Sequence, residues 1–474
     1  MNKLLIFLKK YIPKKLFKTA QPAYHFILSW VAAVFYGHPS KKLIIIGVTG
    51  TTGKTTTVYL MHKILKAAGY KIGCTSTAMF SDGEKEWLND KKMTMVGRFW
   101  TQKMLRNMLR NKCHYAIIET TSEGIKQFRH YFIHYDILVF TGLYEEHIEA
   151  HGNFENYKKT KGKLFAHLKK CCAKYVNKKR ELCNPKTGIQ KIELEKIKKT
   201  IIVNADDQHA DYFLDFWSEQ KYQFTINNYE LQIKNKVGVG VIVASNIKSN
   251  GSGVSFVVNN TEINLQLLGA FNVVNAMAGV CVGLSQGVGM QKIKQGLENI
   301  KTLPGRLEKI DQGQNFTVIV DYAFEPNAVE KLYETIKFIK HNKIIHILGS
   351  TGGGRDVDRR PKLGKIAGEK ADYVIITNED PYDEDPQIII DQVAVGTEYA
   401  GKEINKNLFK ILDRRQAIKK ALALAQKNDI VLITGKGCEQ AICVANGEKI
   451  KWDDREVARE ELYMNRNSVP DTVS

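Results

Sequence analysis

The chain has 474 residues, of which 43% are hydrophobic and 25% charged, a composition that suits a globular protein of two to four domains. No apolar run reaches the ~18–20 residues that span a bilayer, no secretory cleavage site follows an early apolar core, and the eight cysteines lack metal-ligand spacing, so a reducing cytoplasm is expected. The net charge of +20 comes from dispersed lysines without a nucleic-acid-binding signature; it suits anionic substrates such as nucleotides, or reflects a lysine-rich composition.

The first 42 residues form a basic segment that we treat as separate from the rest of the chain. They contain eight lysines and no acidic residue, and an apolar, aromatic stretch follows from Ala23 to Tyr36. Such a segment can lie on the inner face of an anionic membrane as a peripheral contact. Two helices packed on the neighbouring domain would explain the same pattern.

A phosphate-binding loop follows at residues 47–57. The apolar run 43–46 predicts a buried strand, and residues 58–65 predict a helix. Between them, Gly50 and Gly53 allow backbone N–H groups to surround a polyphosphate, Lys54 can reach the β/γ-phosphates and the Thr55 hydroxyl can ligate Mg²⁺. The strict pattern has glycine where Val48 stands. The ATP-binding residues predicted here are Thr49, Gly50, Thr51, Thr52, Gly53, Lys54, Thr55 and Thr56.

Two more buried strands are predicted, at 115–118 and 137–140. The first ends in Glu119, and the second leads to the stretch that contains His147. Because functional residues gather at the carboxyl ends of parallel strands, these side chains are candidates for holding Mg²⁺. An ordinary polar loop is the alternative.

The fold class predicted is α/β in two doubly wound parts. A central ATP-binding domain at 43–303 has a parallel sheet and an antiparallel insertion, which the alternating pattern from Lys221 to Leu268 indicates. Leu303-Pro304-Gly305-Arg306 marks a boundary, and strands alternate with helices in a Rossmann-like domain at 304–464. The polar tail 465–474 is expected to be disordered.

These motifs, in this order, resemble the Mur ligase superfamily, ATP-dependent amide-forming enzymes of peptidoglycan and cell wall biosynthesis, and within it the MurE-type ligases. The resemblance covers residues 43 to about 460. It implies that Glu119 and His147 ligate Mg²⁺ and that Lys161 is carbamylated and supplies a further ligand. Lys54, Glu119, His147 and Lys161 are then the catalytic residues, and Thr55 completes the Mg²⁺ ligands. It also implies that Asn275 contacts adenine, that Arg306 helps to hold ATP and that Asp321 lies near the ribose.

The resemblance places the incoming amino acid in the second domain. The residues implied are Arg355, Glu379, Asp380, Tyr382, Gly435 and Glu439. Phe324, Gly354 and Cys438 depart from the family pattern, and Asp380 and Tyr382 replace the Asn and Arg that suit diaminopimelate. Because tyrosine cannot pair with the distal carboxylate as a guanidinium can, we expect a diamino acid without it, such as lysine or ornithine.

The implied reaction joins an amino acid to the γ-carboxylate of a stem peptide through an acyl phosphate and releases ADP and phosphate. Only about 45 residues precede the loop, which is too few for the family's uridine-nucleotide-binding domain, so the acceptor is expected to be UDP-linked but gripped differently, or lipid-linked. Two alternatives stay open. One is a ligase similar to folylpolyglutamate synthetase, and the other is a non-catalytic nucleotide-binding scaffold.

Overall fold

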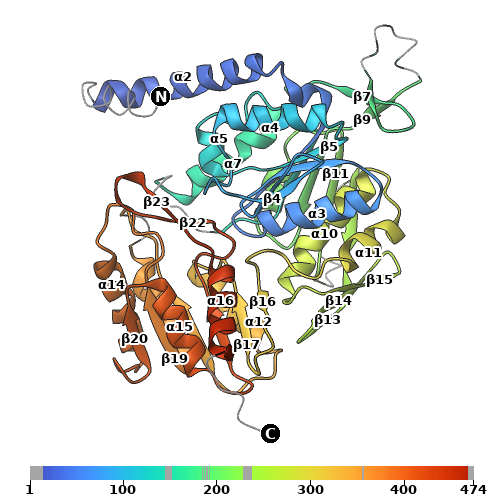
Figure 1. The fold of residues 1–474 in the computed structure, drawn as a ribbon. Coiled ribbons are helices and arrows are strands. Elements are labelled where there is room, and N and C mark those ends of the chain that lie inside the picture. The colour runs from blue at the N-terminus through green and yellow to red at the C-terminus, as the bar shows by residue number, and fades with distance from the viewer. Residues whose placement is uncertain are drawn as a thin grey trace. The chain divides into compact units, whose positions relative to one another are not determined.

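The structure is a computed structural model that describes residues 14–144, 152–183, 193–227, 237–354 and 357–467, with the single positions 185, 187 and 191. These residues form two compact units. The first comprises the described parts of 1–87, 93–243 and 274–296, and the second those of 88–92, 244–273 and 297–474. Each unit is built around its own mainly parallel sheet (Figure 1).

Nine described strands form the sheet of the first unit, in the order β12-β11-β10-β6-β1-β5-β2-β3-β4. The strands β1, β5, β6 and β10 are buried along their whole length, which explains why their sequences are continuous apolar runs rather than alternating ones. The bounds are β1 Ile44–Thr49, β2 Ile72–Thr75, β3 Met79–Ser81, β4 Glu86–Leu88, β5 Tyr115–Glu119, β6 Ile137–Phe140, β10 Thr200–Asn204, β11 Gln220–Thr225 and β12 Val239–Val243.

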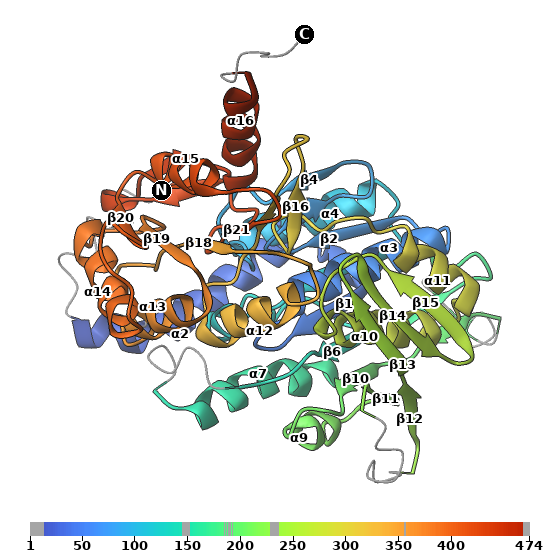
Figure 2. The ribbon, with the colours of Figure 1, turned by 90° about the horizontal axis from the view of Figure 1, so that it is seen from below.

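Helices cover both faces of this sheet (Figure 2). The helices α4 (Arg98–Arg110), α5 (Ser122–Lys126), α7 (Phe154–Leu168) and α9 (Ala210–Leu214) share one hydrophobic core, and α3 (Lys54–Ala67) packs on the other side of β1 with α10 (Phe271–Ser285) and α11 (Met290–Glu298). The helix α2 (Lys14–Phe35), the short η1 (Pro39–Lys42) and a small sheet of β7 (Lys174–Val176), β8 (Leu182–Cys183) and β9 (Glu195–Ile197) complete the unit. Among the described helices, none has the length and hydrophobicity that crossing a membrane requires.

One buried carboxylate fixes the strand that leads into the phosphate-binding loop. Asp136 is fully buried, and its Oδ2 accepts a hydrogen bond of 2.8 Å from the backbone N–H of Ile45 in β1. Lys174 and Lys199 pair with the same carboxylate at 2.5 and 2.8 Å. The Asp136 carboxylate thus has two cationic partners in the core, and its contact with Ile45 sets the position of β1.

The second unit has a six-stranded sheet in the order β16-β17-β21-β18-β19-β20, parallel except for the edge strand β16. Its core has two layers, with α12, α13 and α14 on one face of the sheet and α15 and α16 on the other. The strands are β16 Glu308–Ile310, β17 Thr317–Val320, β18 Ile344–Leu348, β19 Tyr373–Thr377, β20 Leu408–Ile411 and β21 Ile430–Ile433. The helices are α12 Pro326–Ile336, α13 Arg359–Lys370, α14 Pro386–Tyr399, α15 Arg414–Leu424 and α16 Asp454–Asn467.

Two smaller sheets belong to the second unit. The strands β13 (Ser245–Asn250), β14 (Gly253–Val258) and β15 (Thr261–Leu265) are antiparallel, and so are β22 (Ala441–Cys443) and β23 (Lys449–Lys451), which flank the 3-10 turn η2 (Ala445–Gly447). The antiparallel part is shorter than the sequence pattern indicated, because β11 and β12 pair in parallel at the edge of the large sheet. An alternating pattern of apolar and polar residues indicates that one face of a strand is exposed. It does not indicate whether the neighbouring strand is parallel or antiparallel.

Candidate active site

The loop between β1 and α3 has the shape that a polyphosphate requires. Gly50 and Gly53 adopt positive φ angles of 157° and 78°. A Cβ at Gly50 would overlap Thr141 Oγ1, and one at Gly53 would overlap Asn275 Oδ1, so a larger residue would strain the backbone and displace a neighbouring side chain. The N–H groups of the loop and of the first turn of α3 therefore form a cradle that suits an anion.

The predicted ATP-binding residues 49–56 all lie in this loop and in the first turn of α3. The loop is held from β6, because the Thr51 N–H donates to Gly142 O at 2.8 Å and Thr141 Oγ1 donates to Thr52 O at 2.7 Å. The Lys54 ammonium folds back and donates to Thr51 O at 2.6 Å. The ammonium is thus held beside the loop, where it can exchange the carbonyl for a phosphate oxygen as its hydrogen-bond acceptor.

Glu119 and Thr55 lie side by side at the carboxyl end of the sheet. Parallel pairing of β1 with β5 sets Val48 opposite Glu119, which brings the Glu119 carboxylate to the start of α3. Thr55 Oγ1 donates to Glu119 Oε2 at 3.0 Å, and the Thr77 N–H donates to the same oxygen at 2.8 Å. Glu119 is 1% exposed. A hydroxyl and a carboxylate are hard oxygen donors of the kind that Mg²⁺ prefers, so the pair fits that ion.

Lys161 approaches the same loop from α7. Its Nζ donates to Gly50 O at 2.8 Å and lies 4.5 Å from the centroid of the Tyr157 ring. The side chain is 1% exposed. The structure therefore brings Lys161 to the phosphate-binding loop, although 107 positions separate it in sequence from Lys54.

Two of the predicted residues, His147 and Arg355, lie outside the described residues. Within the part of the chain that the structure describes, no three His, Cys, Asp or Glu side chains gather into a metal site. Asn275 lies on α10 beside the start of α3, where its Oδ1 accepts a hydrogen bond of 3.4 Å from Thr57 Oγ1.

In the second unit, Arg306 precedes β16 and Asp321 follows β17, and the antiparallel pairing of Glu308 with Val320 brings these two ends together. The Arg306 guanidinium lies 4.2 Å from the centroid of the Tyr322 ring, and Asp321 accepts hydrogen bonds of 2.7 Å from the N–H groups of Leu307 and Ala323. Burial raises the pKa of Asp321, and Arg306 opposes that rise. The carboxylate therefore orders the backbone that presents Arg306.

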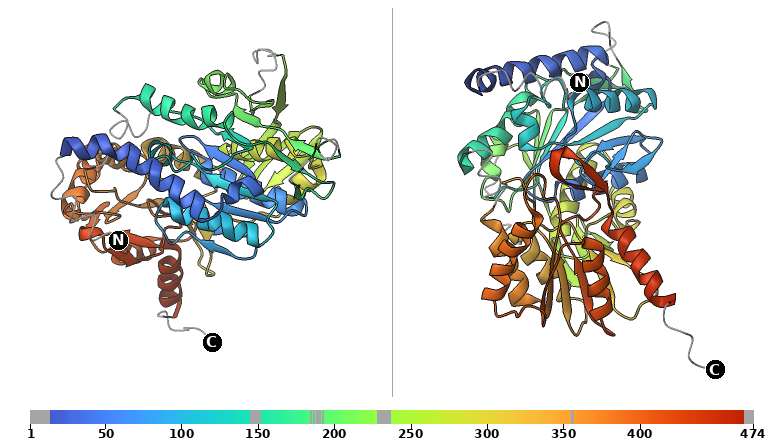
Figure 3. Two further views of the ribbon diagram at one scale, coloured as in Figure 1. Left: turned by 90° about the horizontal axis from the view of Figure 1, so that it is seen from above. Right: turned by 60° about the vertical axis from the view of Figure 1, so that its left-hand side comes forward.

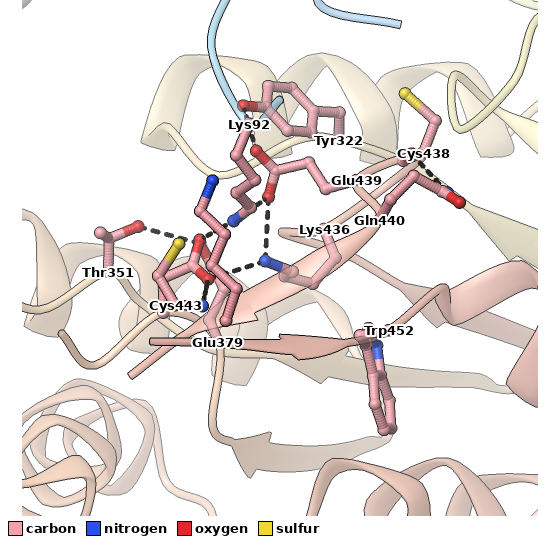
Figure 4. Close-up of polar contacts among 12 residues, drawn as sticks. Lys92, Tyr322, Thr351, Glu379, Lys436, Cys438, Glu439, Gln440, Cys443 and Trp452 are labelled. Carbon is pink, nitrogen blue, oxygen red and sulfur yellow. Dashed lines mark hydrogen bonds and ion pairs between the residues drawn. The ribbon is translucent and has the colours of Figure 1, made fainter. Parts of the chain in front are cut away.

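Four charged side chains form what we call the lysine–carboxylate cluster: Lys92, Asp380, Lys436 and Glu439. Figure 4 labels Lys92, Lys436 and Glu439, with dashed lines for their polar contacts. Lys436 Nζ lies 2.8 Å from Asp380 Oδ1 and 2.9 Å from Glu439 Oε2. Lys92 Nζ lies 2.6 Å from Glu439 Oε2 and also pairs with Asp380. Two ammonium groups thus bridge the same two carboxylates, and the cluster has no net charge.

The pKa values in this cluster follow from burial and pairing. Burial alone would raise the pKa of Asp380, but Lys436 and Lys92 hold it below its ordinary value. Burial alone would lower the pKa of Lys92, but Glu439 and Asp380 raise it. Asp380 and Lys92 are therefore both charged near neutral pH.

Glu379, next to the cluster, has a different environment. Thr351 Oγ1 donates to its Oε1 at 3.0 Å, while its Oε2 has no hydrogen-bond partner among the described residues. Burial, and then the charge of Asp380, raise the pKa of Glu379. The oxygen packs against Gly435, whose φ of 99° and missing Cβ leave room for it.

Asp380 stands where the family pattern has Asn, and the structure shows that two lysines pair with the carboxylate that this replacement adds. Lys92 is the functional candidate that sequence reasoning missed. It stands in a Lys91-Lys92 pair that no local signal distinguishes from the other lysines of this lysine-rich chain. Tyr382, at φ 52°, follows Asp380 closely in the same loop.

Nearby arginines are already engaged with protein carboxylates. Arg360 is fully buried and donates from Nη1 and Nη2 to Glu384 at 2.6 and 2.8 Å. Arg359 pairs with Glu325. Both guanidinium groups have partners in the protein, and they tie the start of α13 to the segments that follow β17 and β19.

Known protein families match the sequence of both units. The Mur ligase middle domain matches residues 48–190 and 189–283, and the Mur ligase glutamate ligase domain matches residues 305–437. A UDP-N-acetylmuramyl-tripeptide synthetase of Roseiflexus sp. is 36% identical over 443 residues, which are 92% of this chain and 81% of the relative. A UDP-N-acetylmuramoyl-L-alanyl-D-glutamate–2,6-diaminopimelate ligase of Bacillus cereus is 32% identical, with 92% and 81% covered.

Solved structures agree on the fold. A UDP-N-acetylmuramoyl-L-alanyl-D-glutamate–2,6-diaminopimelate ligase aligns with a TM-score of 0.56 at 25% identity, over 90% of this chain and 79% of that one. A folylpolyglutamate synthase of Mycobacterium tuberculosis aligns with a TM-score of 0.61 at 15% identity, over 86% and 92%, which is a likeness of fold alone. With two matching domain families, a relative at 36% identity and a phosphate-binding loop of the required geometry, the chain belongs to the Mur ligase family of ATP-dependent, amide-forming ligases.

Proposed function

We propose that this ligase adds an amino acid to the γ-carboxylate of the stem peptide of a peptidoglycan precursor. The carboxylate attacks the γ-phosphate of ATP to give an acyl phosphate and ADP, and the amine of the amino acid then displaces phosphate. The observation that carries the proposal is the group of Thr55, Glu119 and Lys161 around the phosphate-binding loop. The names of the relatives at 32–36% identity support the choice of substrate.

Mg²⁺ fits the oxygen donors of Thr55 and Glu119, and we propose His147 and a carbamylated Lys161 as its further ligands. Bound there, the ion would supply positive charge during phosphoryl transfer. Lys161 is buried and points at the Gly50 carbonyl, so a carbamate would exchange a buried cation for an anion beside the phosphate-binding loop, where it could serve as an oxygen ligand. Loss of activity in Lys161→Ala, with rescue by added short-chain carboxylic acids, would support the carbamate. Activity retained in Lys161→Ala would contradict it.

We further propose that the second unit binds the amino acid through Arg355, Glu379, Asp380, Tyr382, Gly435 and Glu439, and that the amino acid is lysine or ornithine. The lysine–carboxylate cluster supports this choice. Asp380 and Glu439 hold two long-chain ammonium groups, those of Lys92 and Lys436, which have the same chemistry as the distal amine of those amino acids. Tyr382 offers no guanidinium for a distal carboxylate.

The test is ATP-dependent phosphate release with UDP-linked and lipid-linked stem peptides as acceptors and lysine, ornithine, diaminopimelate and glutamate as amino acids. We expect release that requires both an acceptor and lysine or ornithine. Glu119→Gln should lower the rate at least about 100-fold, because it removes a charge from the metal site. Glu123→Gln, at an exposed position on α5, is the matched control. Full activity of Glu119→Gln, or release without any acceptor, would refute the proposal. We also propose that the protein is located in the cytoplasm and contacts a membrane surface.

A further inference from the structure

Helix α2 is apolar on two opposite sides. Residues 20–36 contain no Asp, Glu, Lys or Arg. On the inner side, Ser29, Ala32 and Ala33 are buried against the first unit, and Arg98 of α4 donates to His25 O at 3.2 Å and to Ser29 Oγ at 3.0 Å. The helix is therefore fixed on α4, along which it runs (Figure 3).

The outer side of α2 exposes a stripe of large apolar side chains. Its members recur at intervals of three and four residues, which places them along the outer surface of one helix. They are Tyr24, Ile27, Trp30, Val31, Val34 and Phe35, with exposures from 37% for Val31 to 73% for Phe35. A contiguous apolar surface of this kind marks an interaction site rather than a solvent-facing helix.

Cations surround one end of this stripe. A hollow of about 370 Å³ lies where α2 ends, lined by Val34 and Phe35 on one side and by Lys103, Arg106 and Arg110 of α4 on the other. The sequence has no acidic residue from 1 to 42 or from 91 to 118, so no carboxylate of these segments offsets the cations. An apolar, aromatic stripe beside a cluster of cations complements an anionic phospholipid surface.

We propose that α2 and the basic side of α4 form a docking surface for an anionic phospholipid membrane. The helix lies in the plane of the interface, Trp30 and Phe35 enter the boundary between headgroups and acyl chains, and the hollow receives a lipid phosphate. A second copy of the chain is the less favourable occupant, because a symmetric contact would bring two sets of cations together. The inference does not depend on which amino acid the ligase adds.

The test is flotation of the full chain with two kinds of vesicle. One contains phosphatidylcholine alone, and the other contains phosphatidylcholine with about 30% of the anionic lipid phosphatidylglycerol. We expect binding only to the anionic vesicles. Lys103→Gln, Arg106→Gln and Arg110→Gln should each lower the partition coefficient about five-fold. The matched control is Lys292→Gln, at an exposed position on α11 of the same unit, which should leave the coefficient unchanged.

The apolar contribution is tested by Trp30→Gln and Phe35→Gln, which we expect to lower binding about ten-fold each. Tyr399→Gln, at a side chain that is 81% exposed on α14, is the control. Trp30→Phe should keep binding but remove most of the quenching of tryptophan fluorescence by brominated lipids. Phosphate release and melting temperature should be unchanged in all these variants, because none lies in the catalytic machinery.

Several results would overturn the proposal. Equal binding to neutral and anionic vesicles would refute a role of the cations in binding. No binding to either kind of vesicle would refute a membrane as the occupant of this surface. Loss of binding on deletion of residues 1–13, with full binding by Trp30→Gln and Phe35→Gln, would move the surface away from α2. A dimer in light scattering that Phe35→Gln dissociates, without any vesicle binding, would make a second copy the occupant.

Discussion

The lysine–carboxylate cluster makes a quantitative prediction, because two lysines serve the same two carboxylates. In Lys436→Met or in Lys92→Met, Asp380 and Glu439 each keep one ammonium partner. Lys436 and Lys92 have exposed fractions of 0% and 5%, so their interactions are little screened by water. We expect each single variant to lower the free energy of unfolding of the second unit by about 2–3 kcal/mol, the value of hydrogen bonds to buried charged groups.

The double variant should show a reversed dependence on pH. In the wild type the pKa of Asp380 is lowered, so its contribution to stability is present above about pH 4 and is lost as the pH falls through the lowered value. Without both lysines, burial raises the pKa of Asp380, so stability is lost as the pH rises above about 4. Protonating a carboxyl of pKa ~3.9 costs about 4 kcal/mol at pH 7 and about 1.5 kcal/mol at pH 5. The double variant should therefore recover about 2–3 kcal/mol relative to the wild type between pH 7 and pH 5.

Hydrogen exchange of peptides from β19 and β21, followed by mass spectrometry at pH 5 and pH 7, measures these opening free energies within the second unit. Lys410→Met is the matched control, because the Lys410–Asp391 pair is 3.0 Å long but largely exposed and should contribute less than about 1 kcal/mol. Single and double variants that all differ from the wild type by less than about 1 kcal/mol would refute the reasoning. A loss in the double variant that grows as the pH falls would refute it as well.

Three further predictions concern other sites. Gly53→Ala should weaken ATP binding at least about ten-fold in calorimetry, because its Cβ would overlap Asn275 Oδ1, whereas Gly69→Ala has a similar positive φ but open space and should leave ATP binding unchanged. His346 is fully buried and burial lowers its pKa from 6.5 to about 3, so its contribution to stability is present above pH 6.5 and is lost as the pH falls toward 3. His346→Phe should flatten that slope in urea unfolding, and an unchanged slope would contradict the assignment. Tyr382→Arg should raise diaminopimelate-dependent phosphate release relative to lysine-dependent release, and an unchanged ratio would count against the proposed specificity.

Sequence alone was sufficient for the features that depend on neighbouring residues. The phosphate-binding loop is local, because a strand, two glycines at fixed spacing and a helix start determine its shape within a dozen residues. The position of Glu119 was also predictable. It ends a continuous apolar run, and parallel strands that are both buried end at the same edge of a sheet.

Contacts between distant segments were decided by the tertiary structure. Lys92 meets Asp380 and Glu439 across 288 positions or more, and nothing in a pair of adjacent lysines indicates which one becomes buried. The direction of β12 was likewise hidden, since an alternating pattern is the same for parallel and antiparallel neighbours.

Residues 1–42, which precede the phosphate-binding loop, show both what the sequence determines and what the tertiary structure decides. Its composition, with eight lysines, no acids and an aromatic stretch, was sufficient to suggest either a membrane surface or packing against a domain. The structure shows that α2 does pack, through Ser29, Ala32 and Ala33, and that it still exposes a second apolar side. Sequence determines how apolar a helix is and where its stripes lie, but which stripe is covered depends on the side chains that the rest of the fold brings against it.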